Sequence, residues 1–326
     1  MRRLLAEWEH QRMVQLTWPH AATDWNYILA DAEDNFLRIA RAIMRYGKLV
    51  VISEDAERIH RLLGEDVEVL EIASNDTWAR DHGGITVEED GKKKVLDFCF
   101  NGWGMKFAAD KDNLITERMA ERGCFERLNC RDYVLEGGSI ETDGCGTLLT
   151  TSLCLLSPNR NATLTREGVE ERLCREFGVS RILWLEHGAM AGDDTDSHID
   201  TLARLAPDDT IIYQGCQNPD DSHYEEMQAM RRELEAFRTK DGTPYLLVEL
   251  PMPAPQYEDD FRLPATYANY LAINGAVLVP TYDCPQDDEA LNRIKSVFAD
   301  RDVIGIDCRT LIRQHGSLHC VTMQYY

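Results

Sequence analysis

The sequence lacks the features that mark membrane-spanning proteins and disulfide-bonded secreted proteins. No run approaches the roughly 18 apolar residues that a membrane-spanning helix needs. The ten cysteines include no CxxC pair, and the polar residues that follow Leu5 come too early for the apolar stretch of a signal peptide. We therefore expect a cytoplasmic protein whose cysteines are free thiols.

Basic residues are scarce relative to acidic ones. The chain has 35 Lys and Arg against 57 Asp and Glu, a formal net charge of -22. Such a charge disfavours binding to nucleic acid or to an anionic membrane, and it attracts cations. The partner we expect is a small cationic compound, with neither nucleic acid nor membrane involved and with a homo-oligomer left open.

The interior of the chain has no linker rich in Pro, Gly or Ser, so we predict a single domain over residues 1–326. Helical and strand patterns alternate along it, for example a helix over 31–46 followed by a strand over 48–52. Polar loops recur between them, at Trp18, Asp81, Glu136, His198, Asn269 and Cys320. A period near 60 residues indicates a repeat. The pattern predicts an α/β fold of five units of about 65 residues, closed around an axis, with the first and last loops in one unit.

The segment before the end of the chain carries a candidate nucleophile. A Gly316-Ser317 turn leads into an apolar segment that we predict to be a strand opening with Cys320. Glycine allows a sharp turn and a close approach to a ligand. A cysteine on the strand after it would be held rigidly, as a nucleophile should be. The alternative is a buried cysteine that packs as a small apolar side chain.

A second candidate motif is His198-Ile199-Asp200. In a strand, residues i and i+2 share a face, so we expect both side chains to point into the same space. One alternative is a histidine satisfied within the core. Another is a metal site, because acidic residues crowd the preceding segment 193–196. That spacing lacks the glycine and closing glutamate of a calcium loop and a His pair at i, i+4, so we expect no metal.

Two further carboxylates lie in loops that contain glycine: Asp81, after Trp78, and Glu136, before Gly137 and Gly138. With the motifs above they make a set of one thiol, one imidazole and three acids. Carboxylates raise the pKa of a thiol, which opposes thiolate formation. The conflict disappears if the substrate is a guanidinium ion. Its planar N–H donors match carboxylates, and its charge favours the thiolate.

Five segments in this order resemble a known family: NDTWARDHGG, YVLEGGSIETDG, GDDTDSHIDTLAR, LPATYANY and HGSLHCVTMQ. They are similar to the guanidine-modifying (pentein) superfamily, and in particular to the agmatine deiminase / bacterial-type peptidyl-arginine deiminase family. The resemblance runs from about Trp8 to Tyr326. It implies a five-bladed α/β propeller, in agreement with the repeat.

The resemblance also implies roles for these residues. Cys320 would be the nucleophile and His198 the general acid and base, while Glu136 would orient or charge His198. Asp81 and Asp200 would grip the guanidinium. Neither a metal nor an organic cofactor would be needed. Agmatine deiminases usually carry a Gly-Gly-Gly-Asn-Ile-His-Cys type of segment, whereas this chain has His-Gly-Ser-Leu-His-Cys over 315–320, and this departure concerns the distal end of the substrate.

Agmatine is the substrate we expect, with N-carbamoylputrescine and ammonia as products in polyamine synthesis. Its second cation suits an acidic protein with tryptophans available for cation contacts. We expect Trp78 to contact the substrate, and the candidate contacts to its distal end are Trp18, Asp24, Trp25 and Asn269.

Several substrates and functions stay open besides agmatine deimination. Free arginine would need a basic residue for its carboxylate, for which Arg80 and Arg262 are candidates. A peptidyl-arginine substrate would need an open cleft. A non-catalytic guanidine- or polyamine-binding protein stays open as well, as does a metallohydrolase.

Overall fold

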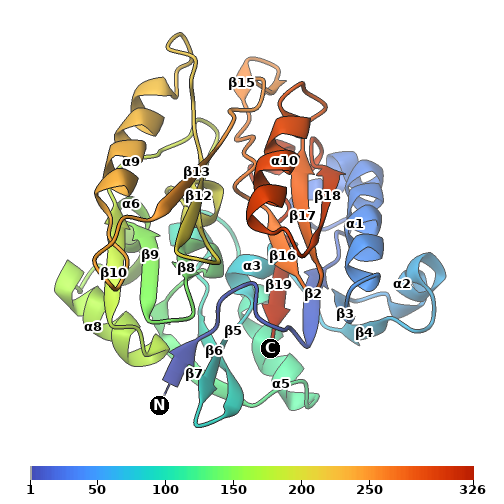
Figure 1. Ribbon diagram of the computed structural model, residues 1–326. Coiled ribbons are helices and arrows are strands. Elements are labelled where there is room, and N and C mark those ends of the chain that lie inside the picture. Colours follow the sequence, from blue (N-terminus) through green and yellow to red (C-terminus); the bar gives the residue numbers. More distant parts are fainter. Residues whose placement is uncertain (1) are drawn as a thin grey trace.

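The chain builds five small sheets that share one pairing pattern, as seen in a computed structural model that describes residues 2–326. In each sheet a first strand pairs antiparallel with a second, and the second pairs parallel with a third. Figure 1 shows the sheets around a common centre, with the longer helices toward the periphery. The predicted α/β fold of five units is therefore confirmed.

In chain order of their middle strands, the units are β19–β2–β3 (Thr322–Tyr325, Met13–Thr17, Leu49–Ser53), β5–β6–β7 (Ile85–Glu89, Lys92–Cys99, Arg127–Val134), β8–β9–β10 (Ile140–Thr142, Thr147–Thr151, Arg181–Leu185), β11–β12–β13 (Ala203–Ala206, Thr210–Gln214, Leu246–Leu250) and β16–β17–β18 (Leu271–Ile273, Ala276–Thr281, Asp302–Asp307). Two edge strands extend the first two sheets, namely β4 (Glu68–Glu71) and β1 (Arg2–Leu4), and a separate hairpin consists of β14 (Tyr257–Glu258) and β15 (Phe261–Arg262).

Parallel strands need a crossover connection, and here helices supply it. The longer ones are α1 (Leu29–Met44), α2 (Ala56–Leu63), α5 (Ile115–Glu121), α8 (Arg166–Phe177), α9 (Tyr224–Ala236) and α10 (Asp287–Val297). In α1 the residues Phe36, Ile39 and Ile43 recur at helical spacing and are buried against the sheet layer. The helix predicted over 31–46 is found within two residues at each end, because such spacing is a local signal.

Short helical turns fill the connections near the centre. They are η1 (Asp24–Ile28), α3 (Ala79–His82), α4 (Gly102–Met105), η2 (Asp112–Leu114), η3 (Gly137–Ser139), α6 (Ser152–Leu155), α7 (Pro158–Asn161), η4 (Ile199–Thr201) and η5 (Leu311–Gln314). Figure 1 shows α3 close to the centre of the ring of sheets. Four candidate site residues lie within these turns, namely Asp24, Trp25, Asp81 and Asp200, and three directly precede one, namely Trp78, Glu136 and His198.

The two ends of the chain close the ring. Strand β19, near the C-terminus, pairs antiparallel with β2, with Thr322 opposite Leu16. At the other end β1 pairs with β5 of the second unit, with Arg3 opposite Glu88. The first unit is thus assembled from both ends of the sequence, as the repeat predicted.

Two local predictions are wrong. His198 and Asp200 do not lie on a strand: Asp200 belongs to the 3-10 helix η4, and His198 precedes it. Cys320 lies in a turn, and β19 begins only at Thr322. In both places the chain must bend from the centre of the ring into the first strand of a unit, and a tight turn overrides the local preference for extended structure.

Within residues 2–326, no helix combines the length and the apolar character needed to cross a membrane. Apolar side chains form three buried clusters between the sheets and the helices. The assignment of residues 1–326 to a single domain stays a prediction.

Candidate active site

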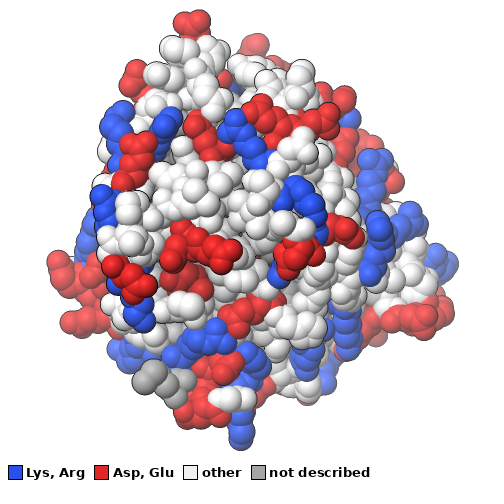
Figure 2. Space-filling model, viewed as in Figure 1, with Lys and Arg blue, Asp and Glu red and all other residues white. Residues whose placement is uncertain are grey.

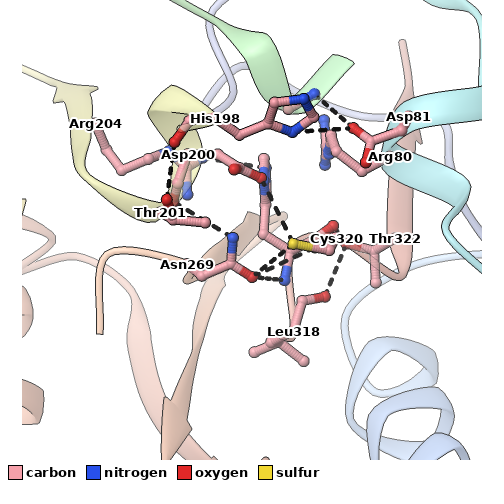
Figure 3. Close-up of polar contacts among 12 residues, drawn as sticks. Arg80, Asp81, His198, Asp200, Thr201, Arg204, Asn269, Leu318, Cys320 and Thr322 are labelled. Carbon is pink, nitrogen blue, oxygen red and sulfur yellow. Dashed lines mark hydrogen bonds and ion pairs between the residues drawn. The ribbon is translucent and has the colours of Figure 1, made fainter. Parts of the chain in front are cut away.

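The loops that open the five units converge on one buried cluster. Figure 3 shows the side chains of Asp81, His198, Asp200, Asn269 and Cys320 gathered around the sulfur atom. A cavity of about 230 Å³ reaches this cluster, with Asp81 and Cys320 among its lining residues. The repeat thus brings residues that are far apart in the sequence into one pocket.

The Cys320 thiol is 5 % exposed and lies between two polar groups. Its Sγ is 3.4 Å from Asn269 Oδ1 and 4.0 Å from Asp200 Oδ2. Burial raises the pKa of Cys320 well above its ordinary value, and the carboxylates of Asp200 and Asp81 raise it further. The thiol is therefore protonated at neutral pH until a cation arrives beside it.

The turn that leads to Cys320 is made by His315 rather than by Gly316. His315 has a φ of 64°, in the left-handed region, and its Nδ1 lies 2.8 Å from the carbonyl oxygen of Gly192. Gly316 is needed for another reason, since a Cβ there would lie 2.1 Å from Cζ3 of Trp78. The indole of Trp78 thus rests directly on this backbone and forms part of the cavity wall.

Asp81 is held in place by two donors. Its Oδ2 accepts a hydrogen bond from Trp103 Nε1 at 2.9 Å, and its Oδ1 accepts one from the backbone N–H of Gly138 at 3.0 Å. Burial raises the pKa of Asp81 to about 6, with the charge of Asp200 adding to the rise and His198 opposing it. A cationic ligand would hold this carboxyl ionised.

Gly138 explains why the Glu-Gly-Gly segment bears glycine. A Cβ at this position would lie 2.6 Å from His198 Nδ1, 2.9 Å from Asp81 Oδ1 and 3.1 Å from Asp200 Oδ2. Any larger side chain would therefore collide with three candidate site residues at once. The same distances show that the three polar groups surround one point.

His198 is fully buried, and its Nδ1 lies 3.6 Å from Asp81 Oδ1. Neither ring nitrogen has a hydrogen-bond partner within residues 2–326. Burial alone would lower the pKa of His198, but the charge of Asp81, with Cys154 and Glu136 nearby, raises it well above its ordinary value. His198 is thus charged at neutral pH and can donate a proton to a ligand.

Asp200 presents one oxygen to the protein and keeps the other free. Its Oδ2 lies 2.7 Å from His319 Nδ1, whereas its buried Oδ1 has no hydrogen-bond partner among the described residues. Burial would raise the pKa of Asp200, yet the hydrogen bond from His319 and the nearby charges lower it. An ionised carboxylate with an unpaired buried oxygen is suited to a cationic N–H donor.

Glu136 lies near His198, and no hydrogen bond joins their side chains. An oxygen of Glu136, a ring nitrogen of His198 and Cys154 Sγ lie within 4.8 Å of one another. Both oxygens of Glu136 instead accept from Arg160 Nε at 3.0 Å, and Arg160 Nη1 binds Asp196 at 2.6 Å. Glu136 can therefore influence the charge of His198, but its orientation is set by Arg160, a residue that no motif in the sequence singles out.

The groups that could ligate a metal ion already hold arginines. Ligand atoms come together at Glu136, Cys154 and His198, and again at Glu7, Glu141 and His319. Arg160 binds the carboxylate of the first group, and Arg204 binds both carboxylates of the second. The acidic segment before His198 is likewise engaged, since Asp193 accepts the backbone N–H groups of Thr195 and Ser197 and so shapes the turn.

The cavity is rich in acidic residues. Besides Asp81 it is lined by Asp24, Asp76, Asp112 and Asp194. Burial and the charge of Asp24 together raise the pKa of Asp76 to about 7. Lys111 lines the same cavity, and no other Lys or Arg among the described residues does so.

Three of the residues expected at the distal end of the substrate do not line this cavity. Trp18 lies in the core against Phe36, with its Nε1 bonded to Glu33, and Trp25 is buried behind Trp78 at a ring distance of 5.7 Å. Asn269 contacts the thiol and not the distal end. Trp103 lines the cavity together with Trp78. It has a φ of 55° and lies between Gly102 and Gly104, and these flanking glycines were a usable signal in the sequence.

Neither arginine considered for a substrate carboxylate lines this cavity. Arg262 forms a two-pronged ion pair with Asp221 at 2.8 Å. Arg80 points to the other side of the cluster and contacts Gln324.

Comparison with known proteins places these features in context. A family model described as Porphyromonas-type peptidyl-arginine deiminase matches residues 3–325. An agmatine deiminase from Pseudomonas aeruginosa (strain LESB58) is 31 % identical, over 99 % of this chain and 95 % of its own.

Among solved structures, a provisionally assigned arginine deiminase from Porphyromonas gingivalis is 54 % identical with a TM-score of 0.96, covering 100 % of this chain and 98 % of its own. An agmatine deiminase of C. jejuni, a Cys-to-Ser variant with substrate bound, is 37 % identical with a TM-score of 0.95, covering 100 % and 96 %. A dimethylarginine dimethylaminohydrolase shares the fold alone. It is 13 % identical with a TM-score of 0.54, covering 97 % of this chain and 100 % of its own. The expected pentein fold is confirmed, and this chain belongs to the Porphyromonas-type peptidyl-arginine deiminase family.

Proposed function

We propose that this protein is an agmatine deiminase, which converts agmatine and water to N-carbamoylputrescine and ammonia in the cytoplasm, as a step of polyamine synthesis. Relatives that bear this name over nearly the whole chain support the proposal. The ten free cysteines are compatible with a reducing compartment.

The observation that carries the proposal is a small cavity that reaches the Cys320 thiol and is lined by five aspartates. The acidic residues that line it are Asp24, Asp76, Asp81, Asp112 and Asp194, and Figure 2 shows acidic side chains spread over the surface as well. A volume of about 230 Å³ is below the roughly 300–1,000 Å³ of sites for drug-sized ligands. Agmatine carries a guanidinium at one end and an ammonium at the other, so a cavity with several carboxylates can pair with both charges.

In the first half of the reaction the guanidinium lies between Asp81 and Asp200. Its charge lowers the pKa of the Cys320 thiol, which releases its proton to solvent, and the thiolate attacks the guanidinium carbon to give a tetrahedral adduct. His198, which starts as an imidazolium, gives its proton to the departing nitrogen. The carbon–nitrogen bond breaks, ammonia leaves, and an amidino-cysteine remains.

In the second half His198 is neutral and acts as a base. It takes a proton from a water molecule, and the resulting hydroxide attacks the amidino carbon. The carbon–sulfur bond then breaks as the hydroxyl proton of the adduct passes to the departing sulfur, which releases the urea-type product and returns Cys320 to its thiol form. The charge of Glu136 near His198 favours the return of the imidazole to its charged form.

At the distal end we assign the substrate ammonium to Asp24 and Asp76. These two acids line the cavity, and the pKa of Asp76 is raised to about 7 by burial and by Asp24. A bound cation between them would relieve their repulsion. Of the residues that the sequence predicted for this role, Asp24 alone is retained. Trp78 forms the cavity wall beside the methylene groups of agmatine.

Free arginine is the second candidate because Lys111 lines the same cavity and could accept a carboxylate. The nearby acids oppose this choice, since they would repel that carboxylate. The family description raises a peptidyl-arginine substrate as a further alternative with the same residues at the thiol.

The deciding experiment is an ammonia-release assay on agmatine, free arginine and a blocked arginyl peptide, with Cys320→Ser as the matched inactive control. Agmatine should give the highest kcat/KM. A preference for arginine or the peptide would overturn the substrate assignment, and binding of agmatine without ammonia release would indicate a binding protein.

A further inference from the structure

A second cavity lies behind the catalytic cluster. It measures about 70 Å³, and its lining residues include Arg80, Glu141 and His319. The next residues along the chain after Arg80 and His319, namely Asp81 and Cys320, line the active-site cavity instead. Adjacent residues therefore face opposite cavities, and the layer between them is thin enough for groups in the second cavity to touch catalytic side chains.

His319 is the group in this layer that touches a catalytic carboxylate directly. The side chain is buried, its Nδ1 lies 2.7 Å from Asp200 Oδ2, and its Nε2 lies 2.8 Å from Glu7 Oε2. Its backbone N–H donates to Asn269 Oδ1 at 2.9 Å. Because an ionised carboxylate only accepts hydrogen bonds, Nδ1 donates to Asp200, and Nε2 donates to Glu7 when it carries a proton. Arg204 Nη2 lies 3.1 Å from the same Nε2.

Glu7 in turn is fixed by two units of the ring. Its Oε1 accepts the backbone N–H of Ala272 at 2.7 Å, and its Oε2 lies 2.5 Å from Arg204 Nη2. Arg204 is anchored by the carbonyl oxygen of Tyr270 at 2.6 Å. Figure 1 shows the segment between β1 and β2, which carries Glu7, crossing the centre of the ring of sheets. The N-terminal segment thus reaches the rear of the active site.

We propose that His319 is a positioning residue for Asp200, with Glu7 setting the orientation of the imidazole. The imidazole fixes Oδ2 of Asp200, and this leaves the unpartnered Oδ1 aimed at the guanidinium. The inference rests on the proposed function for the identity of the ligand. Its geometric basis is the contact chain from Glu7 through His319 to Asp200.

Two variants of His319 separate positioning from a merely structural role. In His319→Asn the amide nitrogen takes the place of Nδ1 and can still donate to Asp200. In His319→Gln it takes the place of Nε2 and can only reach Glu7. A misplacement of about 1 Å can cost about 100-fold in rate, so we expect kcat/KM to fall by about 100-fold in the Gln variant and by less than about tenfold in the Asn variant. Equal losses in both would overturn the proposal.

Glu7→Gln and Glu141→Gln form a matched pair. Both acids bind Arg204, but Glu7 alone also forms a hydrogen bond with His319 among the described residues. We expect Glu7→Gln to lower kcat/KM about tenfold more than Glu141→Gln. An equal effect would show that only the charge around Arg204 matters and would refute the proposal. This pair also decides the question if His319→Gln fails to fold.

A readout without turnover uses the alkylation of Cys320 by the cationic reagent chloroacetamidine and by its neutral counterpart chloroacetamide. A correctly aimed Asp200 should favour the cationic reagent. The rate with chloroacetamidine divided by the rate with chloroacetamide should therefore be high in the wild type and in His319→Asn. This ratio should fall about tenfold or more in His319→Gln. An unchanged ratio in His319→Gln would contradict positioning. If the wild type released no ammonia from any guanidine compound, the proposed function would fail while this ratio still tested His319.

Discussion

Replacement of Arg160 by methionine is expected to destabilise the fold by about 3–5 kcal/mol, because it strands a buried charge. The side chains of Arg160 and Glu136 are both 0 % exposed, and Arg160 Nε is 3.0 Å from each oxygen of Glu136. Arg160 also binds Asp196 at 2.6 Å and the carbonyl oxygen of Thr195 at 2.8 Å. Burial would lower the pKa of Arg160, yet these acids raise it, so the guanidinium is charged in the folded protein.

The expected loss is a large share of the total stability, since folded proteins are stable by only about 5–15 kcal/mol. The measurement is denaturant unfolding followed by circular dichroism, with wild type and variants compared under one set of conditions. The double variant Arg160→Met/Glu136→Gln removes the stranded carboxylate. It should recover about 1–3 kcal/mol of the loss, the cost of leaving one buried polar group unpaired.

Arg38→Met is the matched control. Arg38 pairs with Asp34 at 2.6 Å, but the two side chains are 55 % and 60 % exposed, so its loss should cost less than about 1 kcal/mol. If Arg160→Met were as stable as this control, or if the double variant were no more stable than Arg160→Met, the role assigned to the buried ion pair would be wrong.

The remaining predictions concern the chemistry. Cys320→Ser should abolish ammonia release while Cys145→Ser should not, and a fully active Cys320→Ser would refute the mechanism. Asp200→Asn should lower kcat/KM by about 30-fold or more, because a buried charged donor loses its partner at about 2–5 kcal/mol; wild-type kinetics would contradict the assignment. The ratio of kcat/KM for agmatine to that for butylguanidine should rise as the pH increases through about 7. In this range Asp76 loses its proton and gains the charge that attracts the ammonium of agmatine. Asp76→Asn should flatten this rise, and a ratio that does not change with pH in the wild type would count against the role of Asp76. The same ratio should fall as ionic strength rises, since agmatine carries two charges and butylguanidine one, and its constancy in a salt series would argue against steering by the net charge of -22.

The sequence by itself determined the number of units and the residues around the thiol. Hydrophobic spacing is local, so α1 and its neighbours could be placed from residues such as Phe36 and Ile39. The polar loops recur at a regular period, and a closed ring of equal units must bring them together. Cys320, His198 and Asp200 were therefore selected before any distance between them was known.

The tertiary structure decided what surrounds those residues. Local pattern predicted strands at Asp200 and Cys320, but the bend from the centre of the ring into each unit imposes tight turns there. Trp25 and Trp103 both pack against Trp78. Which of the two lines the cavity depends on the side of Trp78 on which its indole lies. These outcomes follow from contacts between units, and no spacing along the chain encodes them.

The same reason explains the partners that the sequence did not reveal. Arg160 reaches Glu136 from the helical turn α7 between β9 and β10 of the same unit, and Glu7 reaches His319 because the two ends of the chain meet in the first unit. A buried carboxylate requires a charged or hydrogen-bonding partner, but its chemistry does not say which residue supplies it. The residue types along the chain thus established the need for such partners, and the packing of the five units selected them.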